Sequence, residues 1–186
     1  MAAMGSIAPT TIRLKDGTVV GLRTPGDDDA AAALAYARLN IKDGVGSVST
    51  PDEFTLTIDD ERQFLADHLA HPDDLVIIAE REGTLVGFVN FKASRRKRLA
   101  HHGPFGISVH PDWRGRGIGR GLLQALLKWA RANPRLTKVS LAVIADNERA
   151  IALYRELGFI EEGRRVNHIR YDDGRYVDDI LMYVLV

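Results

Sequence analysis

A glycine-rich turn between two apolar segments constrains the fold more than any other feature of the sequence. It reads WRGRGIGRG over residues 113–121, with glycine at every second position from Gly115 to Gly121. A strand-like segment, GPFGISV (103–109), precedes it, and an apolar periodicity that predicts a helix over 117–132 follows it. Each glycine inside a first helical turn costs about 0.5–1 kcal/mol relative to alanine. Because the unpaired N–H groups of a helix start attract anions, the turn predicts a phosphate-binding site with arginines around it.

The spacing of these glycines excludes two common nucleotide-binding loops. A Walker A loop ends in Gly-Lys-Ser/Thr, and the turn contains no such triplet. The dinucleotide pattern G-x-G-x-x-G fails as well, because its third glycine would fall on Arg120 or on Leu122. The phosphate that this turn binds therefore belongs to another kind of ligand.

The rest of the chain predicts one mixed α/β domain over residues 10–186, after a start (1–9) that is disordered or a cloning remnant. Turn signals and apolar patterns predict strands and helices in alternation. The predicted strands are hairpins over 11–23 and 74–92, the strand 103–109, and strands over 137–144, 159–169 and 175–186; the other predicted helices cover 28–40, 59–70 and 147–157.

Composition excludes several classes of protein. Lys+Arg and Asp+Glu both number 25, so the net charge is zero, which argues against nucleic acid as a partner despite the run RRKR at 95–98. The absence of cysteine excludes disulfides and thiolate metal sites, and His68 and His71 lack a third ligand, so no metal is expected. No apolar run reaches the roughly 20 residues of a membrane span, and no signal peptide is visible, so a cytoplasmic protein without membrane contact is expected.

Two motifs resemble those of the GCN5-related N-acetyltransferases, the GNAT family. Arg114–Gly119 matches Arg/Gln-x-x-Gly-x-Gly/Ala, the acetyl-CoA loop of that family, and ISVHPDW (107–113) matches the strand before it. NERAIALYRELGF (147–159) matches the second motif, Asn-x-x-Ala-x-x-Leu-Tyr-x-x-x-Gly-Phe, in the expected order. The resemblance implies the GNAT fold, with a mostly antiparallel sheet of about seven strands and about four helices. Its fourth and fifth strands, here 103–109 and 137–144, are expected to splay apart.

The resemblance also implies an activity, the transfer of acetyl from acetyl-CoA to a primary amine of a small molecule or peptide by direct attack in a ternary complex. The Val109 N–H would polarise the thioester carbonyl, and Tyr154 would act as the general acid. From pattern alone, Asn147 is a helix N-cap and Tyr154 a packed aromatic residue. The residues expected to bind the cofactor are Ile107, Ser108, Val109, Arg114, Gly115, Arg116, Gly117, Ile118, Gly119, Arg120, Asn147 and Tyr154.

The general base is the part of the chemistry that the motifs do not provide. Ala142 stands where some relatives have a glutamate. His102 is the candidate base, because histidine changes charge between pH 5 and 8; His101, Glu53 and a chain of waters are alternatives. The missing glutamate also keeps open a catalytically inactive module that binds acetyl-CoA as a sensor or scaffold. Relatives further suggest a homodimer through the C-terminal strands.

Overall fold

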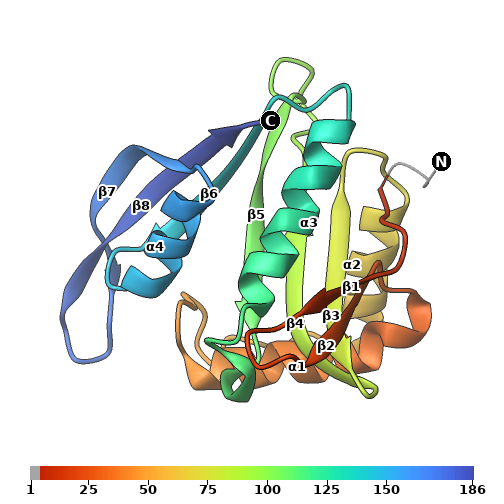
Figure 1. Ribbon diagram of the computed structural model, residues 1–186. Coiled ribbons are helices and arrows are strands. Elements are labelled where there is room, and N and C mark those ends of the chain that lie inside the picture. The colour runs from red at the N-terminus through yellow and green to blue at the C-terminus, as the bar shows by residue number, and fades with distance from the viewer. Residues whose placement is uncertain (1–4) are drawn as a thin grey trace.

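The computed structural model describes residues 5–186, which form one eight-stranded sheet with α-helices on both faces (Figure 1). The strands lie in the order β1-β2-β3-β4-β5-β6-β8-β7, and every neighbouring pair except β5 and β6 is antiparallel. Their bounds are β1 Thr10–Arg13, β2 Val19–Arg23, β3 Leu75–Arg81, β4 Thr84–Phe91, β5 His102–Val109, β6 Lys138–Ile144, β7 Ile160–Arg170 and β8 Tyr176–Leu185.

Helices cover the sheet in two pairs, α3 and α4 in front of it and α1 and α2 behind it in the view of Figure 1. Their bounds are α1 Ala30–Asp43, α2 Ile58–Leu69, α3 Ile118–Ala132 and α4 Glu148–Glu156. The prediction of a mixed, mostly antiparallel sheet with four helices is confirmed over the described residues. The sheet there has eight strands, as many as the residue patterns predict and one more than the resemblance implies.

The apolar stripe of α3 makes the main core against the sheet. Leu122, Leu123 and Leu126 are fully buried and belong to the same core cluster as Val89 and Phe91 of the sheet. The helix approaches the N-terminal hairpin closely, since a Cβ built at Gly121 would lie 2.5 Å from Cδ1 of Ile12. The last glycine of the turn is therefore required by packing of the helix on β1.

The predicted start, residues 1–9, falls partly outside the described residues. Residues 1–4 are not described. The Ile7 N–H donates a hydrogen bond to Thr24 Oγ1 (2.9 Å), and the Ile7 side chain packs against the main core. Ile7 therefore has a defined place against the sheet, and the domain boundary at residue 10 stays a prediction.

β5 and β6 pair only at one end, which is the feature that creates the site. His102, Gly103 and Pro104 of β5 pair with Lys138, Val139 and Ser140 of β6. Beyond these residues the two strands diverge (Figure 1), as the resemblance implied. The backbone groups of β5 from Phe105 to Val109 that face β6 are therefore free for another partner.

The described residues include no helix that is both long enough and apolar enough to cross a membrane.

Candidate active site

A cleft of about 1330 Å³ opens where β5 and β6 diverge. Its walls come from both strands, the glycine turn, α4, β7 and the loop that follows α1. Pockets for small ligands usually measure roughly 300–1,000 Å³. The cleft therefore has room for a large cosubstrate together with a second molecule.

The glycine turn forms one end of this cleft. Gly115 and Gly117 have φ values of 83° and 111°, in the region that favours glycine. A Cβ built at Gly117 would meet no atom within 4 Å, so the backbone faces open space there. Gly121 makes the first helical hydrogen bond, to the Gly117 carbonyl (3.0 Å). The N–H groups of residues 118–120 are consequently unpaired within the helix and available to an anion.

The three arginines of the turn have different surroundings. Arg120 lines the cleft and forms an ion pair with Glu156 of α4. Arg114 also lines it, but its guanidinium is held 2.7 Å from Asp43 Oδ2 and donates to the Val109 carbonyl (3.1 Å). Arg114 therefore fastens the turn to β5 and to the end of α1.

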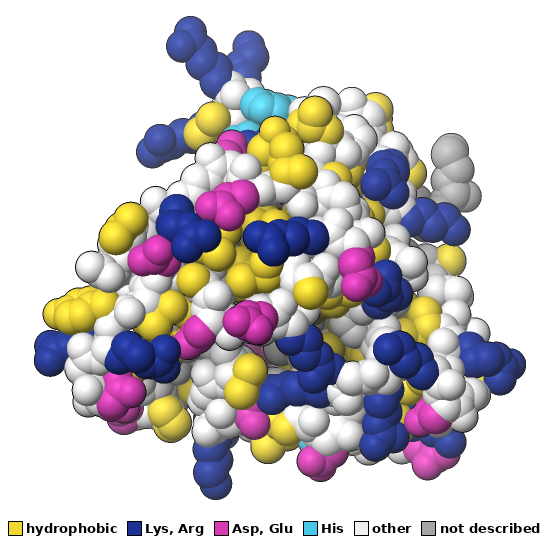
Figure 2. Space-filling model, turned by 60° about the vertical axis from the view of Figure 1, so that its left-hand side comes forward, with side chains coloured by type: hydrophobic (Ala, Val, Ile, Leu, Met, Phe, Trp, Pro, Cys, Tyr) yellow, Lys and Arg dark blue, Asp and Glu magenta, His cyan; other side chains and the backbone are white. Residues whose placement is uncertain are grey.

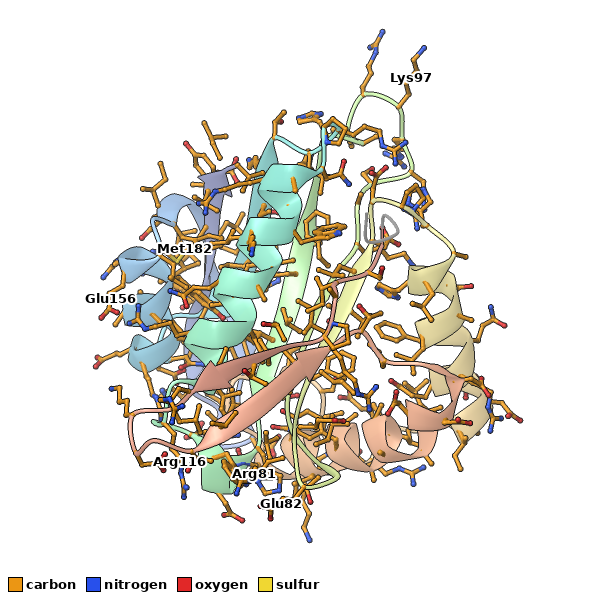
Figure 3. All side chains as sticks on the ribbon, turned by 45° about the vertical axis from the view of Figure 1, so that its right-hand side comes forward. Arg81, Glu82, Lys97, Arg116, Glu156 and Met182 are labelled. Atoms are coloured by element: carbon orange, nitrogen blue, oxygen red, sulfur yellow. The ribbon has the colours of Figure 1, made fainter. Side chains whose placement is uncertain are left out.

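Arg116 is not among the residues that line the cleft, so its predicted part in cofactor binding has no support from the cleft geometry. Its guanidinium stacks 4.9 Å from the ring centroid of Trp113 and lies 3.6 Å from Asp16 Oδ2. Figure 3 shows Arg116 beside the β1–β2 turn. Trp113 and Asp16 therefore hold the Arg116 guanidinium outside the set of residues that line the cleft.

Arg149 is a basic residue of the cleft that sequence reasoning missed. It lies in the first turn of α4, and its Nη2 is 3.3 Å from the position that a Cβ of Gly115 would take. Within the described chain it has no ion pair, so its charge is free for a ligand. In the sequence it occupies a variable position of the second motif and looks like any solvent-facing helical arginine.

The predicted thioester contact points into the cleft. The His110 N–H donates to the Val86 carbonyl of β4 (3.0 Å). Because successive N–H groups of a strand point to opposite edges, the Val109 N–H points away from β4, toward the gap before β6. Ile107, Ser108 and Val109 all line the cleft. The splayed strand thus presents an unpaired donor where the sequence analysis places the thioester.

Tyr154 of α4 lines the same cleft from the other side of the gap. Its side chain is only 6% exposed and packs edge-on against Phe105 (ring centroids 5.9 Å) and Phe159 (5.8 Å). Burial raises the pKa of the Tyr154 hydroxyl to about 12. Among the described residues this hydroxyl has no hydrogen-bond partner, so it is protonated and available at neutral pH.

Asn147 is both a helix cap and a part of the cleft wall. Its side-chain oxygen accepts a hydrogen bond from the Ala150 N–H (3.2 Å) at the start of α4. Its Nδ2 lies 3.0 Å from the position that a Cβ of Gly46 would take. The loop after α1 therefore reaches across to α4 and covers part of the cleft.

His102 does not line the cleft, so no contact there supports its predicted role as the base. It lies at the paired end of β5 and seven residues from Val109, about 23 Å along an extended strand. The loop that holds residues 95–101 is at the end of the molecule opposite the glycine turn, as Lys97 and Arg116 show in Figure 3. Figure 2 shows basic side chains protruding from that end beside histidine. Neither His101 nor Glu53 belongs to the cleft wall over residues 5–186.

β7 contributes titratable side chains that sequence reasoning did not single out. The strand register shifts between Arg165 and Ile169, and Asn167 adopts a φ of 51° with its N–H bonded to Asp178 Oδ1 (2.9 Å). His168, inside this bulge, lines the cleft, as does Asp179, which is paired with Arg165 at 3.0 Å. The residue pattern that predicts the strand over 159–169 gives no sign of this bulge. The described residues contain no cluster of three possible metal ligands.

Comparisons with known proteins agree with this geometry. The model of the acetyltransferase (GNAT) family matches residues 42–159. The chain is 40% identical over 107 residues to the N-alpha-acetyltransferase RimI of Mycobacterium tuberculosis, covering 55% of this chain and 62% of that protein. It is 30% identical over 106 residues to the L-amino acid N-acetyltransferase AaaT of Escherichia coli, covering 57% and 65%. In both cases the matched part is less than two thirds of the relative's length.

The fold has a counterpart among solved structures over nearly its whole length. The acetyltransferase of the GNAT family from Streptococcus pneumoniae superposes with a TM-score of 0.86 at 27% identity, covering 90% of this chain and 99% of that one. The family match spans more than half of the chain and includes both motifs and the strands β5 and β6 that diverge at the cleft. The protein is therefore a member of the acetyltransferase (GNAT) family.

Proposed function

We propose that this protein transfers the acetyl group of acetyl-CoA to a primary amine of a small molecule or peptide, by direct attack in a ternary complex. The observation that carries the proposal is the gap between β5 and β6, where the Val109 N–H and the Tyr154 hydroxyl lie at one cleft with the glycine turn at its end. The two relatives named above act on amines according to their names, an N-alpha-amine and an L-amino acid.

The residues of the cleft fit acetyl-CoA. When bound, this cosubstrate supplies an activated thioester whose carbonyl carbon an amine can attack. The unpaired N–H groups at the start of α3 and the free guanidinium of Arg149 suit its phosphates. The free edge of β5 from Phe105 to Val109 suits an extended chain with amide groups, which hydrogen-bonds as an added strand does.

Side chains around the gap provide the proton transfers, and a backbone N–H provides the charge stabilisation. The Val109 N–H donates to the carbonyl oxygen and stabilises the negative charge that develops there. A new C–N bond forms as the C–S bond breaks, and Tyr154 gives its proton to the departing sulfur. His168, which lines the cleft, replaces His102 as the candidate acceptor of the proton that the amine loses.

A catalytically inactive module that only binds acetyl-CoA is the second candidate. The observation that favours it is Ala142, which lines the cleft at the position where some relatives have a glutamate. Such a module would keep the glycine turn and the free edge of β5 and would bind acetyl-CoA without consuming it.

Calorimetry and a thiol-release assay test the proposal. We expect acetyl-CoA to bind while ATP and NAD do not, and free thiol to appear only when an amine is added. The amines would form a panel of amino acids, peptides with free N-termini and diamines. Failure to bind acetyl-CoA contradicts the proposal, and binding without thiol release for any amine favours the inactive module.

Arg149→Ala is expected to weaken acetyl-CoA binding about tenfold, which is about 1.4 kcal/mol. The reason is the loss of a guanidinium that has no partner within residues 5–186 and lies beside Gly115. Because the contact is electrostatic and partly exposed, the loss should shrink at high salt. Calorimetry at two salt concentrations measures both effects.

Arg116→Ala is the matched control for this experiment, since it removes the same charge from a side chain held outside the cleft. Its acetyl-CoA affinity should stay within about twofold of the unaltered protein. Equal losses in the two variants would show that neither arginine acts by local contact.

A further inference from the structure

A second, smaller cavity of about 170 Å³ adjoins the cleft on the face of the sheet that α1 and α2 cover. Ala37 and Ser108 line both cavities, so the two spaces share a wall. Ser108 is the neighbour of Val109, whose N–H faces the reaction site. The residues that line the smaller cavity are Ala33, Tyr36, Ala37, Glu61, Phe64, Phe88 and Ser108.

Glu61 is the charged residue of this cavity. It lies in the first turn of α2 and is 7% exposed, whereas Asp59 and Asp60 in the same turn are exposed. Acidic residues in a first turn commonly stabilise the helix dipole while they remain in water, and that role does not call for burial. Most of the Glu61 side chain is withdrawn from solvent, and a carboxylate in such a place is stabilised by a cationic partner.

No partner for the Glu61 carboxylate is present in the part of the chain that the structure describes. It makes no side-chain hydrogen bond or ion pair there, and burial alone raises its pKa. By contrast, the two carboxylates that line the cleft are neutralised, Asp179 by Arg165 and Glu156 by Arg120. A cation from outside the described chain would therefore satisfy Glu61.

The walls around Glu61 are aromatic and carry two hydroxyl groups, those of Tyr36 and Ser108. The ring of Phe88 lies 6.5 Å from that of Tyr36 and 6.4 Å from that of Phe64, measured between centroids. The Tyr36 hydroxyl lies near the Ser108 side chain on the same wall. Aromatic faces attract cations, and an ammonium has three donors for such oxygens. Carboxylate, rings and hydroxyl together have the chemistry of an ammonium site.

We propose that this smaller cavity binds a second, non-reacting ammonium group of the acceptor, which makes a short diamine the substrate class. The inference rests on the proposed function, because it assigns the acceptor of the same reaction. The cavity lies over β4 and β5 and the thioester is expected between β5 and β6, so the two points are roughly one or two strand spacings apart, about 5–10 Å. A short carbon chain spans that separation past Ser108.

The test compares 1,4-diaminobutane with butylamine as acceptors for the intact protein. We expect kcat/KM to be at least about tenfold higher for the diamine. Glu61→Gln keeps the size of the side chain and removes its charge, and it should abolish this preference, mainly through KM of the diamine. Asp59→Asn removes a charge from an exposed side chain of the same helical turn and should leave the preference unchanged. Equal kcat/KM for the two amines would overturn the inference.

A second variant and two further measurements separate the possible failures. Phe64→Leu removes a ring from the cavity wall while it keeps an apolar side chain, and it should reduce the diamine preference severalfold. Thermal unfolding and acetyl-CoA affinity of both variants show whether the fold and the cleft are intact. If Glu61→Gln does not fold, an unchanged preference in Phe64→Leu overturns the inference. Failure to bind acetyl-CoA contradicts the proposed function itself, whereas acetylation of other amines without preference for the diamine contradicts only this inference.

Discussion

Replacing Tyr154 by phenylalanine is expected to lower kcat by about 10²–10⁴-fold and to leave acetyl-CoA affinity nearly unchanged. The ring is held by Phe105 and Phe159, contacts that phenylalanine preserves, so the packing of α4 on the sheet should survive. Only the hydroxyl is lost, and its raised pKa of about 12 keeps it protonated as the proton donor at neutral pH. Steady-state kinetics together with calorimetry separate the effect on turnover from the effect on binding.

Tyr176→Phe serves as the control for this substitution. Tyr176 is 55% exposed on β8 and lies outside the cleft wall, so its hydroxyl should be dispensable and kcat unaltered. A Tyr154→Phe protein that turns over at the normal rate would remove Tyr154 as the general acid. A variant that loses acetyl-CoA affinity in parallel with kcat would assign the hydroxyl to cofactor binding instead.

Gly117→Ala is expected to weaken acetyl-CoA binding about a hundredfold, roughly 2.8 kcal/mol. A Cβ at this position would project into the open space above the start of α3, where the pyrophosphate is expected to lie. The φ of 111° is also unfavourable for alanine, so some loss of stability, on the order of 1–3 kcal/mol, should accompany the change. The affinity is measured by calorimetry under conditions in which thermal unfolding shows the variant to be folded.

Gly174→Ala separates backbone strain from steric obstruction. Gly174 lies in the turn between β7 and β8 with a φ of 85°, and a Cβ there would also meet no atom within 4 Å. Both variants should lose comparable stability, but only the change at Gly117 should affect acetyl-CoA. If Gly174→Ala weakens acetyl-CoA binding equally, the effect at Gly117 comes from general destabilisation. The assignment of the phosphate-binding site to the glycine turn would then be wrong.

The parts of the site that sequence predicted are those determined by local backbone chemistry. Alternate glycines between a strand and a helix require an unusual backbone, which the φ values of Gly115 and Gly117 bear out. The helix that carries Tyr154 is identified by its apolar period and its Asn cap, and its position follows from the splayed strands. Local patterns of this kind survive folding because neighbouring residues decide them.

The residues that sequence misplaced depend on contacts between distant segments. In the sequence His102 is near Val109, because both belong to one strand. In the structure the two residues lie at opposite ends of β5, with His102 at the end that pairs with β6. Arg116 is drawn away by Asp16, which lies about a hundred positions earlier in the chain. His168 lines the cleft because of a bulge in β7. Glu61 is buried beside Phe88, without a charged partner among the described residues, only once α2 packs on the sheet. None of these placements follows from periodicity or spacing.

Because β5 and β6 pair over a short length, the sheet of the free protein has few main-chain hydrogen bonds at its centre. Within residues 5–186, main-chain contacts join the two parts of the sheet at the pairing of His102–Pro104 and at the hydrogen bond from the Thr137 N–H to the His101 carbonyl (2.9 Å). The side chains around Phe105 and Tyr154 hold the remainder together. A ligand that lies between the open edges of the two strands can form the hydrogen bonds that β5 and β6 do not form with each other. The cosubstrate would then be part of the sheet while it is bound. Release of the product would reopen the gap between β5 and β6 for the next molecule.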